Sequence, residues 1–124
     1  MSKTIRDIRG DLEAGRTTAV ALAEAALEHL EDKKSYNTVI SLARTRALTR
    51  AKKIDEARAA GESLGKLAGI PFIAKDNFLT FGTTTTAAVK ILENFEAPYQ
   101  STAIERLEAE GAIMIAKANL DAFA

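Results

Sequence analysis

Hydrophobic residues in the first part of the chain recur at the three- and four-residue spacing of amphipathic helices. The first stripe begins at Ile5, directly after Thr4, which can form a capping box with Asp7. Gly15 follows the last apolar residue of this stripe, in the position where helices commonly stop. The pattern therefore predicts a short helix with one narrow apolar face.

Two longer amphipathic stripes follow, separated by a polar break. The expected helices run from Thr17 or Thr18 to about Asp32, and from about Ser41 to Ala60. A threonine at the first boundary supplies a hydroxyl for the unpaired amides of a helix N-terminus, and Gly61 ends the last helix. Residues 36–40 are β-branched and aromatic, which fits either a short strand or an extended linker.

The pattern changes from helical to α/β after Gly61. We expect strands at 70–74 and 112–116, a threonine-rich loop at 80–86, one or two helical turns at 90–95, and a helix from 102 to 110. The uninterrupted apolar run at 70–74 is typical of a strand covered on both faces, and Thr102 with Glu105 forms a capping box. The loop at 80–86 is too polar for a core, and its hydroxyls fit turns or the lining of a site. Strand, helix and strand make a βαβ unit, so the two strands should be parallel with a right-handed crossover.

Length and composition indicate one globular domain. No repeat or long linker divides residues 1–124, so we treat them as a single domain with a helical part, 1–60, and an α/β part, 61–124. Because 17 basic residues balance 17 acidic ones, we favour a solvated or partner-facing role for the cationic side of the third helix over an RNA patch. The absence of cysteine excludes disulfides and thiolate metal sites and favours a cytoplasmic location. No segment has the pattern of a signal peptide or approaches the roughly eighteen apolar residues of a membrane helix.

Lys75 is the first candidate for chemistry, because the strand at 70–74 delivers it to the carboxyl end, where open α/β sheets bind ligands. The residues alone leave two interpretations open. In one, Lys75 is a solvated cation beside Asp76. In the other, it takes a proton from a serine hydroxyl, which requires desolvation or a cationic neighbour. The apolar residues placed to desolvate it are Phe72, Ile73 and Phe78.

Several short motifs stand out between residues 65 and 124. They are Leu67-Ala68-Gly69-Ile70-Pro71, Lys75-Asp76-Asn77, Gly111-Ala112-Ile113 and Lys117-Ala118-Asn119-Leu120-Asp121. Together they resemble the amidase signature family. Within it, residues 90–95 with Pro98-Tyr99 and Ser101-Thr102 are most similar to the A-type subunits of bacterial glutamyl-tRNA(Gln) amidotransferases. The helical part is similar too, so the resemblance spans the whole chain, with Val89 and Ala116 as small departures.

The resemblance implies a fold and a role for one residue. The fold is the N-terminal part of an α/β/α sandwich around a mixed sheet, with helices first and then a βαβ unit. Lys75 matches the lysine of the family's Ser-cis-Ser-Lys triad. In that triad the lysine is a general base that acts through the middle serine on the nucleophilic serine, which attacks an amide carbonyl.

The resemblance also implies a substrate and partners. In the amidotransferases, glutamine is hydrolysed and its ammonia passes to a partner subunit, which converts Glu-tRNA(Gln) to Gln-tRNA(Gln). The partners are therefore B- and C-type subunits, and Glu-tRNA(Gln) is reached through the complex. ATP and Mg are used by the partner subunit, and we expect this chain to bind no cofactor or metal itself.

The two triad serines and the glycine-rich oxyanion segment lie beyond the matched motifs in family members. The serines of this sequence are Ser2, Ser35, Ser41, Ser63 and Ser101. Ser41 and Ser101 are interpreted as helix starts, and the others lie near a terminus, at a break or in a polar loop. Because a general base without a nucleophile and oxyanion donors leaves only background rates, we expect this polypeptide alone to be inactive. Two alternatives remain: a non-catalytic module or remnant that contacts other subunits, and a fragment of another amidase-signature hydrolase that acts on fatty or aryl amides.

The other polar residues have structural interpretations. His29, the single histidine, is expected on the surface of the second helix. Residues 83–86 fit turn chemistry and site lining equally well. Glutamates at helical positions are expected to be solvated or capping, so we infer no paired-carboxylate or metal site. Sheet edges left uncovered in this chain would favour self-association or dependence on a partner.

Overall fold

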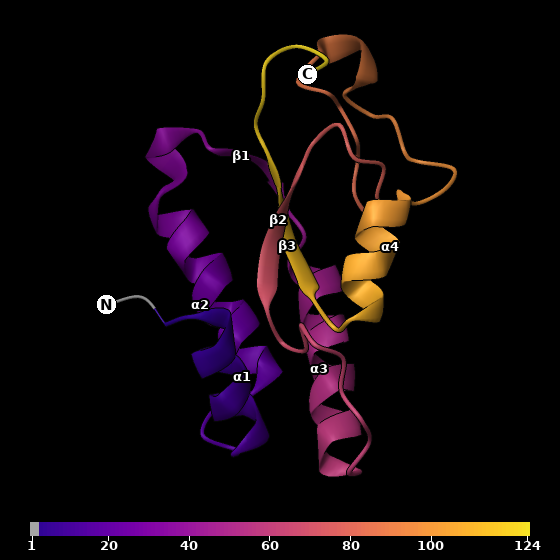
Figure 1. The fold of residues 1–124 in the computed structure, drawn as a ribbon. Helices are drawn as coiled ribbons and strands as arrows, with labels where there is room; N and C mark the ends of the chain where they lie inside the picture. The colour runs from indigo at the N-terminus through magenta and orange to yellow at the C-terminus, as the bar shows by residue number, and fades with distance from the viewer. Residues whose placement is uncertain (1–2) are drawn as a thin grey trace.

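The computed structural model describes residues 3–124, which hold four α-helices, two 3₁₀ turns and three strands. In chain order these are α1 (Ile5–Glu13), α2 (Ala19–Asp32), η1 (Lys34–Tyr36), β1 (Val39–Leu42), α3 (Arg44–Ala59), β2 (Pro71–Lys75), η2 (Lys90–Leu92), α4 (Thr102–Ala109) and β3 (Ile113–Ala118). Helices dominate the first half and the α/β unit follows, as the sequence predicts (Figure 1). Within the described range, no helix combines the length and apolar character needed to cross a bilayer.

Side-chain caps fix the starts of α1 and α2 at the predicted threonines. The Thr4 hydroxyl accepts a hydrogen bond from the Asp7 amide at 3.2 Å, and the Asp7 carboxylate accepts one from the Thr4 amide at 2.9 Å. This confirms the capping box. Thr18 caps α2 by accepting from the Ala21 amide at 3.0 Å, and Asp55 of α3 accepts two further amides from the first turn of α2.

The third helix begins later than predicted. Residues Val39–Leu42 form β1, which runs antiparallel to β3, and α3 begins only at Arg44. Pairing with β3 satisfies backbone groups that the first turn of a helix would leave without partners. Ser41 is therefore a strand residue, and its interpretation as a helix start is wrong. The strand-or-linker segment at 36–40 becomes the end of η1 and the beginning of β1.

The capping box predicted from Thr102 and Glu105 is also wrong. Ser101 is the N-cap of α4 and makes no side-chain capping hydrogen bond, while Thr102 is already the first helical residue. The Ser101 amide donates instead to the Leu79 carbonyl at 2.9 Å. Contact with the preceding loop therefore helps to set where α4 begins, which a local motif does not reveal.

The three strands form one mixed sheet in which β3 is central, in the order β1-β3-β2. Strands β2 and β3 are parallel, which confirms the βαβ unit, and β1 is antiparallel to β3. Helices α1, α2 and α3 pack on one face of the sheet and α4 packs on the other, so the chain has three layers (Figure 1). Residues 113–117 of β3 are all buried between these layers.

Strand β2 is the edge strand of the sheet, and only one of its faces is covered. The prediction that both faces are covered is therefore wrong. Phe72 and Ala74 pack against α4 and the middle of β3. On the opposite face, Ile73 is 43% exposed and Lys75 is exposed. Successive side chains of a strand point to opposite faces. The helices on the second face pack mainly against β3, so the edge strand is covered on one side only.

The larger core lies between the first three helices and β3 and is built mostly from small side chains. Its buried members are Leu12, Ala19, Ala23, Leu27, Ala47, Ala51, Ile54, Ala68, Ile113, Ile115 and Ala116. Two glycines bring the segment before β2 close to the turn between α4 and β3. A Cβ on Gly65 would lie 2.3 Å from the Glu110 carbonyl oxygen, and one on Gly111 would lie 2.7 Å from the Ala68 Cα. These contacts hold the start of β2 beside β3.

Candidate active site

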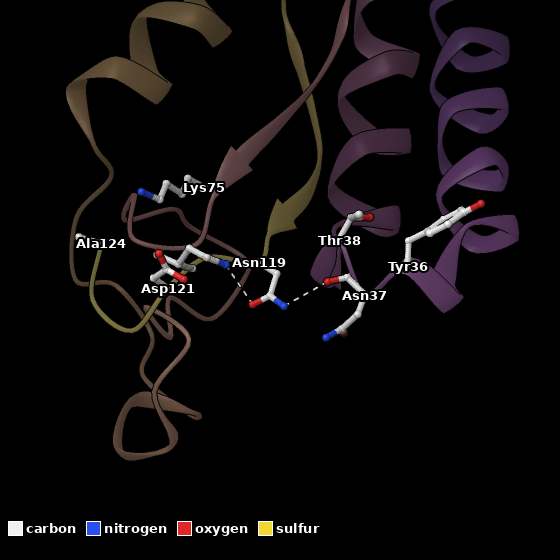
Figure 2. Close-up of a pocket in the computed structure, with 8 residues that line it drawn as sticks. Tyr36, Asn37, Thr38, Lys75, Asn119, Asp121 and Ala124 are labelled. Carbon is white, nitrogen blue, oxygen red and sulfur yellow. Dashed lines mark hydrogen bonds between the residues drawn. The ribbon is translucent and has the colours of Figure 1, made fainter.

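Lys75 is the last residue of β2, and its backbone is fixed on two sides. It lies opposite Ala118 of β3, and its carbonyl accepts a hydrogen bond from the Phe78 amide at 2.9 Å. Its exposed side chain lines an open pocket of about 600 Å³. The other lining residues are Tyr36, Asn37, Thr38, Asn119, Leu120, Asp121 and Ala124. Figure 2 shows Lys75 on one side of the pocket and the residues that precede β1 on the other, with Asn119 between them.

Asn119 connects the two walls of this pocket. Its side-chain nitrogen donates to the Asn37 carbonyl at 3.1 Å (Figure 2). Its backbone amide donates to the Thr38 carbonyl at 2.9 Å. Asn37 has a φ of 53°, in the left-handed region that asparagine adopts more readily than most residues. Sequence reasoning placed Asn119 in a motif but missed this role. The available signal was a polar residue directly after a buried strand.

Asp76 is fully buried and does not accompany Lys75 into solvent. Its Oδ1 lies 2.8 Å from the Nζ of Lys117, an ionic contact without well-directed hydrogen-bond geometry. Its Oδ2 accepts hydrogen bonds from the Thr86 amide at 3.0 Å and the Thr86 hydroxyl at 2.5 Å. The exposed side chain of Lys75 agrees with the interpretation of a solvated cation, but Asp76 does not lie in solvent beside it. Burial and two other partners turn the carboxylate of Asp76 inward.

Lys117 is a fully buried cation that sequence reasoning missed. Its Nζ donates to the Phe78 carbonyl at 3.0 Å, and to the Thr84 carbonyl and the Thr85 hydroxyl at 3.4 Å each. With Asp76, these oxygens surround the ammonium group. A buried lysine needs such compensation, because removing its charge from water costs several kcal/mol. The signal in the sequence was a lone lysine within an apolar strand.

The threonine-rich loop packs inward, although its polarity predicted that it stays outside the core. Thr80, Thr85 and Thr86 are buried. Their hydroxyls find partners inside the protein, which makes the burial of polar groups tolerable. We call Asp76, Lys117, Thr85 and Thr86 the buried polar cluster. None of its members lines the Lys75 pocket.

Two alanines after the cluster have left-handed backbones, with φ of 48° at Ala87 and 55° at Ala88. This conformation costs an alanine about 1–2 kcal/mol. The Ala87 amide donates to the Asp76 carbonyl at 2.9 Å, and the Ala87 carbonyl accepts from the Phe123 amide at 2.9 Å. The Ala88 amide donates to the Thr86 hydroxyl at 3.1 Å. Hydrogen bonds to the cluster therefore hold a strained segment in place.

The described residues do not desolvate Lys75 in the way the sequence suggested. Phe72 packs on the opposite face of β2, in contact with α4. Ile73 and Phe78 are themselves 43% and 40% exposed. Within residues 3–124, Lys75 thus occupies an open and largely polar setting.

No serine of the described residues lines the Lys75 pocket. Ser35 lies in η1, Ser41 in β1, Ser63 in the exposed segment before β2, and Ser101 at the start of α4. Ser2 lies outside the described residues. His29 is exposed in the last turn of α2, as expected. Within residues 3–124, the pocket thus brings Lys75 together with other polar residues such as Asn119 and Asp121, with no serine nucleophile beside them.

Titration and metal binding do not add to the site. In residues 3–124, no group of three histidine, aspartate or glutamate side chains is placed to hold a metal ion. Hydrogen bonds from Thr4 lower the pKa of Asp7 in α1. Hydrogen bonds from Lys3 and Arg16 lower the pKa of Asp11. Neither carboxylate lines the pocket, so both act on the stability of the first helix.

Comparison with known proteins gives consistent matches along the chain. The sequence model of the family described as Amidase matches residues 21–124. The chain is 40% identical over 121 residues to the A-type subunit of a glutamyl-tRNA(Gln) amidotransferase from Thermosynechococcus vestitus, covering 97% of this chain and 25% of the relative. It is 43% identical over 122 residues to the protein of the same name from Nostoc punctiforme, covering 98% and 25%. The chain therefore spans about a quarter of the length of these curated relatives.

Solved structures share the fold. A peptide amidase from Stenotrophomonas maltophilia superimposes with a TM-score of 0.93 at 29% identity, covering 99% of this chain and 26% of that one. A chain from a vestigial protein complex, described for the evolutionary origins of an s-triazine catabolic enzyme, superimposes with a TM-score of 0.93 at 33% identity. That match covers 98% of this chain and 27% of the other. The mixed α/β fold is thus the one seen in these larger proteins.

Proposed function

The chain belongs to the amidase family, and from that membership we propose that it supplies Lys75 as the general base of an amide-hydrolysing site. The observation that carries the proposal is the placement of Lys75. It ends a parallel strand, and its side chain reaches an open pocket at the carboxyl edge of the sheet. Ligands of open α/β sheets bind at this edge. The Lys75-Asp76-Asn77 motif, which resembles the family's lysine motif, supports the same assignment.

The proposed substrate is the side-chain amide of glutamine. Supporting this choice, relatives similar over nearly the whole chain are named as the A-type subunit of glutamyl-tRNA(Gln) amidotransferase. Ammonia released at this site would pass to a B-type subunit, which uses ATP and Mg to form Gln-tRNA(Gln) in the cytoplasm. A C-type subunit would complete the assembly.

The chemistry requires groups that the described residues do not place beside Lys75. As a base, an unprotonated lysine accepts the proton of one serine hydroxyl, and that serine takes the proton of a second serine, whose oxygen attacks the amide carbon. No serine of residues 3–124 lines the pocket. We therefore propose that residues 1–124 are inactive on their own and act when joined to a segment that carries the nucleophile and oxyanion donors.

A chimeric protein tests this proposal. Residues 1–124 would replace the corresponding quarter of the Nostoc punctiforme relative, which would then be assembled with its partner subunits. Ammonia release from glutamine would be measured by a coupled assay. We expect the chimera to be active and Lys75→Ala to lower kcat by about 10²–10⁴-fold, the usual contribution of a general base.

Lys52→Ala is the matched control, because Lys52 is an exposed lysine on α3. It should leave the rate within about twofold, as a surface substitution away from the site. The isolated chain should release no ammonia above its Lys75→Ala variant. A chimera that keeps most of its activity without Lys75 would contradict the assignment.

A second substrate class follows from the structural comparison. The peptide amidase superimposes on this chain with a TM-score of 0.93. The residues that line the Lys75 pocket do not distinguish glutamine from another amide. A second chimera, in which residues 1–124 replace the corresponding quarter of the peptide amidase, should therefore be assayed with C-terminal peptide amides. Activity in this chimera but not in the amidotransferase chimera would favour an amide hydrolase outside tRNA metabolism, and activity in neither would favour a non-catalytic subunit-binding module.

A further inference from the structure

We propose that Asp76 and Lys117 are positioning residues for Lys75, because their buried ion pair withholds from Lys75 the carboxylate that follows it in the sequence. This inference rests on the proposed role of Lys75 as a base. It concerns how the protein keeps that lysine able to lose its proton. Of the two lysines near this strand end, one is buried beside a carboxylate and the other faces an open pocket.

Both oxygens of Asp76 are engaged on the buried side. Oδ1 lies 2.8 Å from the Lys117 Nζ, and Oδ2 accepts from the amide and hydroxyl of Thr86. The side chains of Asp76 and Lys117 are both fully buried. The carboxylate is therefore held by two hydrogen bonds and one ionic contact in an environment where solvent screens little.

A base must spend part of its time unprotonated, and a neighbouring carboxylate opposes this by stabilising the ammonium form. Asp76 is the nearest carboxylate along the chain, one peptide bond from Lys75. Its pairing with Lys117 balances its charge internally. Lys117 cannot take over as the base, because its ammonium is enclosed by backbone and threonine oxygens.

The same pair fixes the backbone at the end of β2. The Asp76 amide donates to the Ala118 carbonyl at 3.1 Å, and the Asp76 carbonyl accepts from the Ala87 amide at 2.9 Å. Asp76 thus joins β2 to β3 through its main chain and to Lys117 of β3 through its side chain. Because Lys75 directly precedes Asp76, these contacts also fix the position of the Lys75 backbone at the pocket.

Other titratable groups around Lys75 must be separated from this effect. Those lining its pocket are Tyr36, from η1, Asp121, from the segment after β3, and, in the 124-residue chain, the terminal carboxylate of Ala124. No carboxylate of residues 3–124 lies within ion-pair distance of the Lys75 ammonium. Asp121→Asn is therefore the matched control, since it removes a carboxylate from the pocket and leaves the buried pair intact.

The test is competitive acetylation of the 124-residue chain with limiting acetic anhydride at mildly alkaline pH, read by mass spectrometry. The labelling rate of each lysine would be referred to exposed Lys52 on α3. In the unaltered chain, Lys117 should label at least about tenfold more slowly than Lys52, since a buried amine reacts only after local opening. This requires no substitution.

Variants then separate charge from structure. In Lys117→Met, the freed carboxylate of Asp76 should make Lys75 label about threefold more slowly. In the uncharged double variant Asp76→Asn with Lys117→Met, the labelling rate of Lys75 should return to that of the unaltered chain. A purely structural role predicts no such return. In the chimeric enzyme, Lys117→Met should move the alkaline-rising part of the pH–rate profile to higher pH, and the double variant should restore it.

Three results would overturn the inference. One is labelling of Lys117 as fast as Lys52 in the unaltered chain. Another is unchanged labelling of Lys75 in a Lys117→Met variant that circular dichroism shows to be folded. The third is labelling of Lys75 that rises about threefold in the double variant, which would mean that Asp76 already acts on Lys75. If Lys117→Met does not fold, the double variant decides alone. Loss of the catalytic role of Lys75 would be seen in the glutamine assay, which the labelling rates do not depend on.

Discussion

The helical part of the chain and the loop that follows Lys75 are held together by opposite kinds of contact. Between α1, α2, α3 and β3, the buried residues are aliphatic and many of them are alanines. Between residues 76 and 86, they are an aspartate and threonines that meet a lysine from β3. The first region depends on the burial of apolar area, and the second on the completeness of a polar network.

This difference predicts how each region responds to damage. Removing a methyl group from an apolar core costs free energy in proportion to the lost contact and the cavity left behind. Removing one member of a buried ion pair leaves an uncompensated charge, which costs more than the pair itself contributes. The polar region should therefore fail abruptly, and the apolar region by degrees.

The largest expected effect is that of Lys117→Met. It leaves the carboxylate of Asp76 buried without its cationic partner and should lower the free energy of unfolding by about 3–5 kcal/mol. The double variant with Asp76→Asn should recover most of this loss, because no charge is left unpaired. Urea unfolding followed by circular dichroism measures both. Lys52→Met on the surface should stay within about 0.5 kcal/mol, and a comparable loss there would remove the contrast.

Leu27→Ala tests the apolar region. Leu27 is fully buried in α2, and its truncation should cost about 2–5 kcal/mol. Leu27→Met keeps the volume and should cost less than about 1.5 kcal/mol. The control is Leu107→Ala on α4, where the side chain is 37% exposed and the loss should be smaller. A Leu27→Met variant as unstable as Lys117→Met would show that the apolar region does not fail by degrees.

The helix starts provide a smaller comparison. Thr18 accepts the Ala21 amide as the cap of α2, so Thr18→Ala should cost about 1 kcal/mol. Thr102 is the first residue inside α4 and is not its N-cap, so Thr102→Ala should change stability by less than about 0.5 kcal/mol. Thermal melts of the two variants measure this difference. Equal losses of stability would support the capping box that the sequence predicts at α4.

The smallest effect concerns acid. Hydrogen bonds lower the pKa of Asp7 and of Asp11 below the ordinary value of 3.8, so both carboxylates favour the folded state when ionised. Their contribution is present above about pH 3.8 and is lost as the pH falls through the lowered values. Amide hydrogen exchange in α1 should therefore quicken below that pH. In Asp7→Asn combined with Asp11→Asn, this acid response of α1 should be weaker, and an unchanged response would contradict the assignment.

Sequence patterns predict those parts of the fold that local periodicity determines. The helices around Leu12 and Leu27 follow from apolar spacing, and the parallel pair β2–β3 follows from a strand, a helix and a strand in series. The predictions for the start of α3 and the cap of α4 were wrong because distant segments determine both positions. The segment is β3 for α3 and the loop at Leu79 for α4. No window of sequence contains those partners.

The candidate site divides in the same way. The position of Lys75 at a strand end was predictable, since the strand before it is apolar and short. The pair of Asp76 and Lys117 was not, because a lysine in an apolar strand shows no sign of which carboxylate it meets. The contact of Asn119 with Asn37 was not predictable for a similar reason, because the two residues are 82 positions apart in the sequence. Polar contacts between remote segments leave no periodic trace in the sequence.

The position of β3 at the centre of the sheet also sets an order of events during synthesis. Both of its neighbours precede it, and Val39 of β1 must wait for Ala118 before it gains a partner. Helices α2 and α3 can associate early on the ribosome, because they contact each other and lie closer together in the chain than β1 and β3 do. Until β3 emerges, β1 and β2 present unpaired backbone to the surroundings. We expect nascent chains that stop before residue 113 to bind chaperones, and those that extend past residue 118 to become resistant to protease.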